Sequence, residues 1–155
     1  MKISDFLKEL VDKFGDRIVK LDQRSAKRLY VSISKESLRA FVIFCFKEKA
    51  LRFNIASAVD TFEGFEVLYH FSDDRDDFIV TLRVLLTDRE KPAIDTITNI
   101  TRSAWWIERE IYELFGINFT GNADLRRLLL PDDWPDGVYP LRKDYISPKR
   151  DSRKA

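Results

Sequence analysis

Cysteine and histidine are almost missing from this chain of 155 residues, which has one of each, Cys45 and His70. One thiol cannot form an internal disulfide, and one thiol with one imidazole cannot supply a thiolate-rich zinc site or a four-cysteine iron–sulfur site. The sequence also has no Gly-rich phosphate loop, no Gly-x-Ser-x-Gly turn and no His-Glu-x-x-His motif. We therefore expect a chain that binds no metal or other cofactor and has no self-sufficient active site.

A charge excess and a long apolar run are missing as well. The 27 Lys and Arg residues balance 26 Asp and Glu residues, for a formal net charge of +1, whereas nucleic-acid-binding domains usually carry a clear basic excess. The longest apolar run, residues 40–46, is far shorter than the ~18 residues of a membrane-spanning helix. The first residues do not form a basic-then-apolar leader. We expect a cytoplasmic-type protein that does not bind nucleic acid.

Apolar residues are plentiful, at 45% hydrophobic and 13% aromatic, which is enough for the core of one ordinary domain. All five prolines lie at or after Pro92, so the early part of the chain is typical of regular structure and the last part of an extended segment. We therefore divide the chain into an α+β domain, residues 1–116, and an extended, partner-binding C-terminal tail, residues 117–155.

Apolar spacing predicts the secondary structure of the domain. The expected elements are a helix over residues 3–14, strands over 17–21 and 27–33, a helix capped by Ser34, strands over 51–56, 65–71 and 78–86, and a helix within 104–116. Short polar linkers join the last three strands, which favours an antiparallel meander. The result is an α+β two-layer sandwich, a mostly antiparallel sheet with helices on one face, in the order αββαβββα plus an extended C-terminal tail.

Local signals refine these elements. Ser4 is the expected N-cap of the first helix and Gly15 its stop. The second helix should point Leu38, Phe41, Val42 and Cys45 inward, so that Cys45 is a small core residue. Leu51, Phe53 and Ile55 should share the inner face of their strand.

Two polar features invite a chemical interpretation. Ser72–Asp77 contains four aspartates, but it has no glycine and Arg75 lies in its middle, so a solvated hairpin fits better than a calcium loop. His70 falls on the polar face of its strand, where a surface histidine without a partner is the simplest interpretation.

The stretch Ala104–Gly116 is unusual for an amphipathic helix. At ~100° per residue, Glu108 falls within an apolar arc, where a carboxylate is costly unless a cation or several donors meet it. Trp106 instead points to the charged side with Arg109, Glu110 and Glu113, and exposed aromatic residues of this kind are enriched in protein interfaces. The alternative is an ordinary amphipathic helix in which the aliphatic part of the Glu108 side chain lies on the apolar surface and its carboxylate reaches water.

The tail combines apolar and charged residues with little room for regular structure. Its apolar side chains include Leu125, Leu128–Leu130 and Trp134. Such a segment needs a surface to lie on, which either its own domain or a partner supplies. Arg126, Arg127 and Arg142 are candidate counter-ions for Glu108, because a guanidinium suits a desolvated carboxylate.

Three blocks in this region carry a family resemblance. The blocks are Glu-Arg-Glu-Ile-Tyr-Glu-Leu-Phe-Gly-Ile at 108–117, Asp-Leu-Arg-Arg-Leu-Leu-Leu-Pro-Asp-Asp-Trp at 124–134 and Pro-Leu-Arg-Lys-Asp-Tyr at 140–145. In this order they resemble the signature of the 30-kDa subunit of respiratory complex I, the NADH-quinone oxidoreductase. The family includes the equivalent subunits of membrane-bound energy-converting hydrogenases. One departure is Asn122-Ala123, where the family often has His-Pro.

The resemblance implies a cofactor-free, non-catalytic structural subunit in the peripheral arm of a membrane-bound, redox-driven ion-pumping oxidoreductase. Its partners would be a large subunit related to nickel–iron hydrogenases and the iron–sulfur subunits. These partners would hold the iron–sulfur clusters and the nickel–iron centre or quinone site. The chain would lie on the cytoplasmic face of the cell membrane and contact it only through the complex. The residues expected to dock are Trp106, Glu108, Arg109, Tyr112, Phe115, Asp124, Arg126, Arg127, Trp134, Leu141, Arg142, Lys143, Asp144 and Tyr145.

Two other functions are compatible with the predicted fold. An antiparallel sheet backed by helices, as in RRM-like sandwiches, can present aromatic residues to nucleic-acid bases, or serve another interaction. A stand-alone enzyme would have to use the aspartate cluster and His70, which offer no convergent set of reactive groups.

Overall fold

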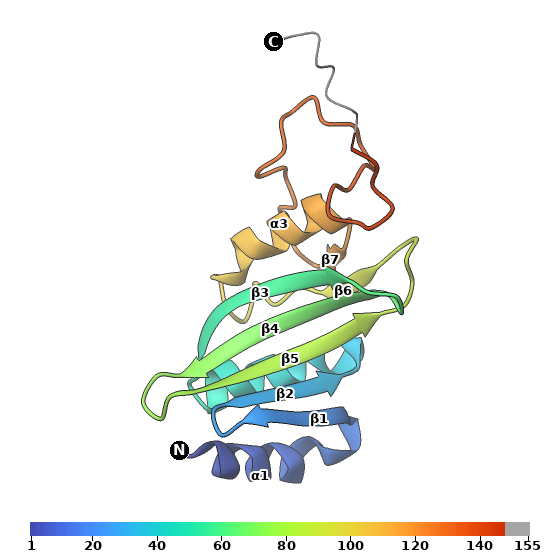
Figure 1. Cartoon of the computed structure of the whole chain (residues 1–155). Coiled ribbons are helices and arrows are strands. Elements are labelled where there is room, and N and C mark those ends of the chain that lie inside the picture. Colours follow the sequence, from blue (N-terminus) through green and yellow to red (C-terminus); the bar gives the residue numbers. More distant parts are fainter. Residues whose placement is uncertain (148–155) are drawn as a thin grey trace.

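The computed structural model describes residues 1–147 (Figure 1). Its helices and strands are α1 (Ile3–Phe14), β1 (Ile18–Ser25), β2 (Arg28–Ile33), α2 (Leu38–Ile43), β3 (Arg52–Asp60), β4 (Phe65–Asp73), β5 (Phe78–Leu86), β6 (Ala93–Asp95), α3 (Ala104–Phe115) and β7 (Asn118–Thr120). Short 3₁₀ turns precede β1 and α2, and a π-helical turn, Phe44–Glu48, extends α2. Within these 147 residues, the longest helices have 12 residues, and none is long and apolar enough to cross a membrane.

The main sheet has five strands in the order β1-β2-β5-β4-β3 (Figure 1). The pairs β1–β2, β3–β4 and β4–β5 are antiparallel, and β2–β5 is parallel. Phe6 of α1 lies 5.8 Å from Phe78, and Phe115 of α3 lies 6.4 Å from Phe65, as measured between ring centroids. Phe65 and Phe78 belong to the inward set of β4 and β5, so these helices cover the same face of the sheet. The predicted α+β class, with a mostly antiparallel sheet and helices on one face, is confirmed.

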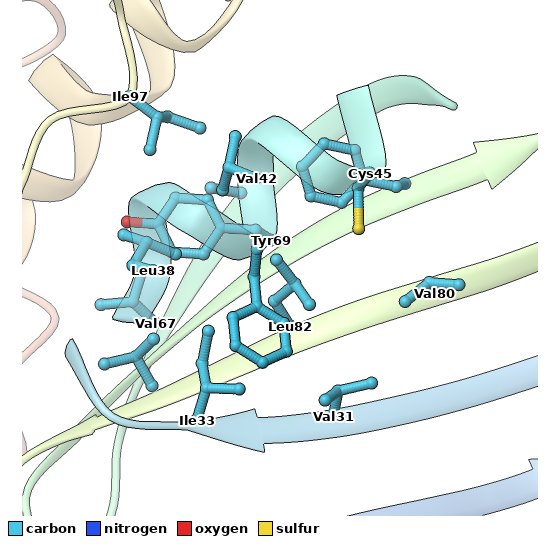
Figure 2. Close-up of a cluster of buried hydrophobic side chains, with 14 of the residues drawn as sticks. Val31, Ile33, Leu38, Val42, Cys45, Val67, Tyr69, Val80, Leu82 and Ile97 are labelled. Carbon is cyan, nitrogen blue, oxygen red and sulfur yellow. The ribbon is translucent and has the colours of Figure 1, made fainter. Parts of the chain in front are cut away.

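The core lies between this sheet face and the helices (Figure 2). Val67 and Tyr69 of β4 and Val80 and Leu82 of β5 are fully buried, as their alternation with polar residues predicted. The inner residues of the second helix, Leu38, Phe41, Val42 and Cys45, are buried as predicted. Burial raises the pKa of the Cys45 thiol well above its ordinary value, so this cysteine is a core residue in its protonated form.

Some local expectations were wrong. α1 begins at Ile3 with Lys2 at the N-cap position, so Ser4 lies inside its first turn. α1 does end at Phe14 with Gly15 at the C-cap position, as predicted, but Gly15 is right-handed (φ −51°) because the chain continues into a 3₁₀ turn. Ile55 is 50% exposed because a β-bulge between Phe53 and Ile55 shifts the alternation, and Ala56 takes the inward position.

A second, two-stranded sheet ties the chain after α3 to the core. β7 pairs in parallel with β6, with Phe119 opposite Ile94. Ile117 and Phe119 are buried in the hydrophobic core. Residues 117–120, which the sequence division places in the tail, are therefore packed on the domain, whereas residues 148–155 of that predicted tail lie outside the described part.

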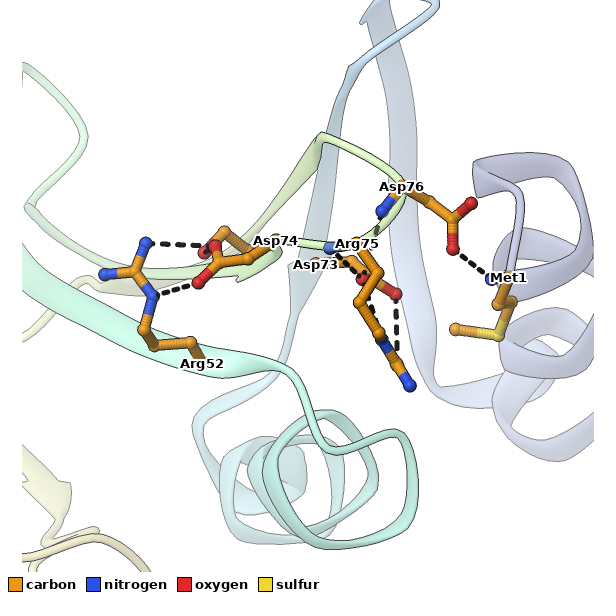
Figure 3. Close-up of polar contacts among 7 residues, drawn as sticks. Met1, Arg52, Asp73, Asp74, Arg75 and Asp76 are labelled. Carbon is orange, nitrogen blue, oxygen red and sulfur yellow. Dashed lines mark hydrogen bonds and ion pairs between the residues drawn. The ribbon is translucent and has the colours of Figure 1, made fainter.

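The hairpin between β4 and β5 holds the four aspartates, each with its own partner, and Figure 3 shows three of them, Asp73, Asp74 and Asp76. The partners are the N–H groups of Arg75 and Asp76 for Asp73, Arg52 for Asp74, the N-terminus of Met1 for Asp76 and Lys27 for Asp77. Asp73 is buried and caps the turn, so the hairpin is less solvated than expected. No group of three or more His, Cys, Asp or Glu side chains in residues 1–147 is arranged to hold a metal ion.

His70 has partners on the open face of the sheet, which corrects the expectation of an unpartnered surface histidine. Its ring nitrogens lie 3.2 Å from the Ser57 hydroxyl and 3.0 Å from the Thr81 hydroxyl. Partial burial lowers its pKa. These bonds join β3, β4 and β5, so we interpret His70 as a structural residue.

Candidate functional site

Residues 121–147, which we call the tail segment, leave β7 and loop over α3 (Figure 1). The tail segment contains neither helix nor strand, and none of its residues is fully buried. Leu125 packs against the core, and polar contacts with α3 and the nearby loops hold much of the rest of the segment. These contacts define the candidate site.

Glu108 joins the beginning of the tail segment to the connection between β6 and α3. Its side chain is buried, and its carboxylate accepts hydrogen bonds from the Thr96 hydroxyl (2.6 Å), the Ile97 N–H (2.8 Å) and the Asn122 amide (2.8 Å). Burial raises the pKa of Glu108, although the three donors act in the opposite direction. A carboxylate on the apolar side of α3 is thus explained by hydrogen-bond donors.

The prediction that an arginine would be the counter-ion of Glu108 was wrong. Its described partners are a hydroxyl, a backbone N–H and an amide, and the side chain does not reach water. The arginines are engaged elsewhere: Arg126 with Asp124, Arg127 with Asp136 and Arg142 with the Phe115 carbonyl. Asn122 supplies the amide donor.

Arg109 holds the next part of the tail segment. Its guanidinium donates to the carbonyls of Arg126 (3.0 Å) and Arg127 (2.7 Å) and lies over the rings of Trp105 and Trp106, 5.5 and 5.3 Å from their centroids. A planar guanidinium can make both kinds of contact at once. Arg109 therefore couples the backbone of the tail segment to the two tryptophans of α3.

Glu113 holds three consecutive backbone N–H groups, those of Leu128, Leu129 and Leu130. The Leu128 N–H lies 2.5 Å from one carboxylate oxygen, and the Leu129 N–H lies 3.0 and 3.1 Å from the two oxygens. Glu113 is buried beneath the tail segment, although a helical wheel places it on the charged side. Sequence reasoning missed this residue because the donors are backbone groups of an irregular segment, which residue types do not show.

The end of the tail segment is fixed beside the β3–β4 hairpin. Arg142 donates to the Phe115 carbonyl (2.7 Å), and the Leu141 N–H donates to the Leu114 carbonyl (3.1 Å). The Lys143 N–H donates to Asp60 (2.8 Å), which Arg89 also contacts. The pKa of Asp60 is lowered. Burial acts to raise this pKa, but the hydrogen bonds and positive charges of Lys143 and Arg89 outweigh the effect of burial. The tail segment is thus attached at both ends.

Contacts within the tail segment shape its loop. Arg127 donates to the carbonyls of Pro131 (2.8 Å) and Trp134 (2.5 Å) and to Asp136 (2.8 Å). The Trp134 indole donates to the Val138 carbonyl (2.8 Å). Between this loop and α3 lies a cavity of about 470 Å³, lined in part by Tyr112, Leu130, Trp134 and Val138.

The predicted docking residues have different exposures. Glu108, Arg109 and Phe115 are buried. Tyr112, Asp124, Arg127, Trp134, Arg142 and Tyr145 are half-buried. Trp106, Arg126, Leu141, Lys143 and Asp144 are exposed. The buried group acts within the chain, whereas the exposed group is available to a partner.

Comparisons with known proteins match most of the chain, including α3 and the tail segment. A family model described as the 30-kDa subunit of the respiratory-chain NADH dehydrogenase matches residues 31–151. An NADH-quinone oxidoreductase subunit from Chloroherpeton thalassium is 37% identical over 143 residues, which are 86% of this chain and 57% of the relative. The corresponding subunit from Jannaschia sp. is 36% identical over 153 residues, which are 92% of this chain and 72% of the relative.

Among solved structures, a chain of the membrane-bound sulfane sulfur reductase, an archaeal respiratory membrane complex, superposes with a TM-score of 0.81. It is 25% identical, and the match covers 92% of this chain and 85% of that one. The family model covers most of the chain, including all three signature blocks. The chain therefore belongs to the family of the 30-kDa subunit of the respiratory-chain NADH dehydrogenase.

Proposed function

We propose that this chain is a non-catalytic structural subunit of a complex I-like respiratory oxidoreductase or a related energy-converting complex. It binds the large subunit related to nickel–iron hydrogenases through α3 and the tail segment. The iron–sulfur clusters, and the nickel–iron centre or quinone site, belong to partner subunits. The complex couples electron transfer to ion translocation, and this chain lies on its cytoplasmic side, in contact with the membrane only through the complex.

The observation that carries the proposal is the exposure of apolar side chains on an ordered, irregular segment. Leu129 is 60% exposed, Leu141 51% and Trp106 of the adjoining helix 57%. Hydrogen bonds from Arg109 and to Glu113 hold this segment in place without burying these side chains. A preformed surface with exposed large apolar groups is typical of a protein interface. The names of the relatives, all parts of respiratory complexes, agree with this interpretation.

The experiment is co-purification after truncation. A tagged full-length chain is expressed beside the large hydrogenase-like subunit encoded in the same genome and should elute with it. A chain ending at Asn122 should lose that association but remain folded, because it retains β7 and the Asn122–Glu108 bond. Truncation after Gly116 would be a poorer test, since it removes the core residues Ile117 and Phe119.

A chain ending at Ser147 is the matched control, because it retains the whole tail segment. It should co-elute as the full chain does. Circular dichroism checks that the shorter chain is folded. The proposal fails if the full chain never co-elutes with the large subunit, or if the chain ending at Asn122 co-elutes equally well.

A further inference from the structure

The hairpin turn between β3 and β4, residues 61–64, presents a phenylalanine to water. Phe62 lies in this turn and is 98% exposed. Single exposed apolar residues are common on protein surfaces. The support beneath Phe62 and its neighbours on the surface therefore decide whether its position carries a function.

Hydrogen bonds and close packing fix the backbone of this turn. The Thr61 N–H and the Thr61 hydroxyl both donate to the Gly64 carbonyl, each at 2.8 Å, and Arg89 donates to the Thr61 carbonyl (3.1 Å). A Cβ added at Gly64 would lie 2.2 Å from the Leu86 carbonyl oxygen, so the turn packs tightly against the end of β5. The turn thus holds Phe62 outward on a fixed backbone.

The same turn is joined to the end of the tail segment through Asp60. The side chain of Asp60 is buried, and its two oxygens accept separately from Arg89 (2.7 Å) and from the Lys143 N–H (2.8 Å). Phe62 lies two residues after Asp60, and Leu141, which is 51% exposed, lies two residues before Lys143. The exposed ring is therefore carried on a support that adjoins the proposed docking surface.

We propose that Phe62 is an anchor that inserts into an apolar pocket of the large subunit bound by the tail segment. The inference rests on the proposed function and extends its docking surface from the tail segment to the β3–β4 turn. A ring with two rotatable side-chain bonds on a fixed backbone loses little conformational freedom when it binds. Buried aromatic anchors of this kind contribute more to affinity than most surrounding contacts.

The charge beside the ring favours a protein pocket over a membrane surface. Glu63 follows Phe62 directly and is exposed. Insertion of the ring into a bilayer would bring this carboxylate to the anionic headgroups, which repel it. A pocket in a protein can receive the ring and leave the carboxylate at its edge.

The test removes the ring and measures binding to the large subunit. Phe62→Ala should leave the thermal stability of the chain unchanged, because the ring is almost wholly in water. Val11→Ala is the matched control: it also truncates an exposed apolar side chain, 40% exposed, but on α1, at the end of the molecule opposite the tail segment (Figure 1). Each tagged full-length variant is co-expressed with the large hydrogenase-like subunit, and the apparent dissociation constant is measured by diluting the purified pair.

Phe62→Ala should weaken the pair by at least about tenfold, the scale of a lost anchor, and Val11→Ala should bind as the parent chain does. Normal binding by Phe62→Ala overturns the inference, as does equal weakening by both variants. Co-sedimentation of the chain with vesicles of phosphatidylglycerol and phosphatidylcholine tests the membrane as the alternative. Vesicle binding that depends on Phe62, with the pair unchanged, would assign the ring to the membrane surface and also overturn the inference.

These outcomes differ from failure of the proposed function. In that case the parent chain never co-elutes with the large subunit, or the chain ending at Asn122 co-elutes equally well. If only the inference fails, the parent chain and Phe62→Ala bind equally well, and the chain ending at Asn122 still loses the association.

Discussion

Glu113→Gln should release the middle of the tail segment while the domain stays folded. The carboxylate accepts from the N–H groups of Leu128, Leu129 and Leu130. A glutamine has one acceptor oxygen, and its NH₂ group would face an N–H donor. A hydrogen bond to a buried charged group contributes ~1.5–3 kcal/mol, so the loss of at least one of them, with poorer geometry in the rest, should cost about 2–4 kcal/mol of local stability.

Amide hydrogen exchange measures this loss directly. If the three amides exchange when the tail segment opens, their protection should fall by roughly one to three orders of magnitude, since ~1.4 kcal/mol corresponds to tenfold. The melting temperature should change little, because none of the residues in the tail segment is fully buried. Amides in β4 and β5 should keep their protection.

Glu110→Gln is the control for charge. It makes the same change on the same helix, and no hydrogen bond joins Glu110 to the described tail segment. Equal protection of the three leucine amides in the two variants would refute the role of Glu113. A parallel loss of protection in β4 and β5 would also refute it, because the carboxylate would then stabilise the whole domain.

Two further predictions concern Gly116 and Glu108. Gly116 is left-handed (φ +71°), and an added Cβ would lie 2.5 Å from the Tyr139 ring and 2.8 Å from the Arg142 guanidinium. Gly116→Ala should therefore destabilise the protein by about 1–2 kcal/mol from the backbone alone and also displace the end of the tail segment, as measured by denaturant titration. Gly15→Ala, with φ −51° and its nearest contact at 3.8 Å, should be neutral or stabilising in the same titration. For Glu108, burial raises the pKa in the folded state, so the native protein holds this proton more tightly than the unfolded chain. Its contribution to stability therefore declines as pH rises from the unfolded pKa of about 4.3 up to the raised value, and is constant above it. Glu108→Gln should be less stable throughout but lack this decline, so the difference from the parent chain should narrow with rising pH; a difference that widens with pH would contradict the assignment.

The strands and helix faces could be predicted because alternation and helical spacing report burial directly. In β4 and β5 the inward residues follow every second position without interruption, as the sequence indicated. The alternation failed at Ile55, where a bulge changes the phase of β3. It also gave no sign of β6 and β7, which are three residues each and too short to show a period.

The candidate site was predictable in position but not in mechanism. The sequence located α3 and the tail segment, and it identified Glu108 as a carboxylate in need of partners. It assigned arginines to that role because charge pairing is the interaction that residue types reveal. The structure instead uses Asn122, a hydroxyl and a backbone N–H for Glu108, and three backbone N–H groups for Glu113.

This use of backbone donors bears on how the tail segment would bind a partner. An unstructured tail would have to lose conformational entropy on binding, at a cost of ~0.5–1.5 kcal/mol for each ordered long side chain, besides the ordering of its backbone. Glu113 and Arg109 fix the backbone of the tail segment before any partner is present, through its N–H and carbonyl groups. The side chains of Leu129 and Leu141 are then left for other contacts. Variants at Glu113 should therefore weaken partner binding even though the hydrogen bonds of this carboxylate lie within the chain, because the lost order would have to be restored in the complex.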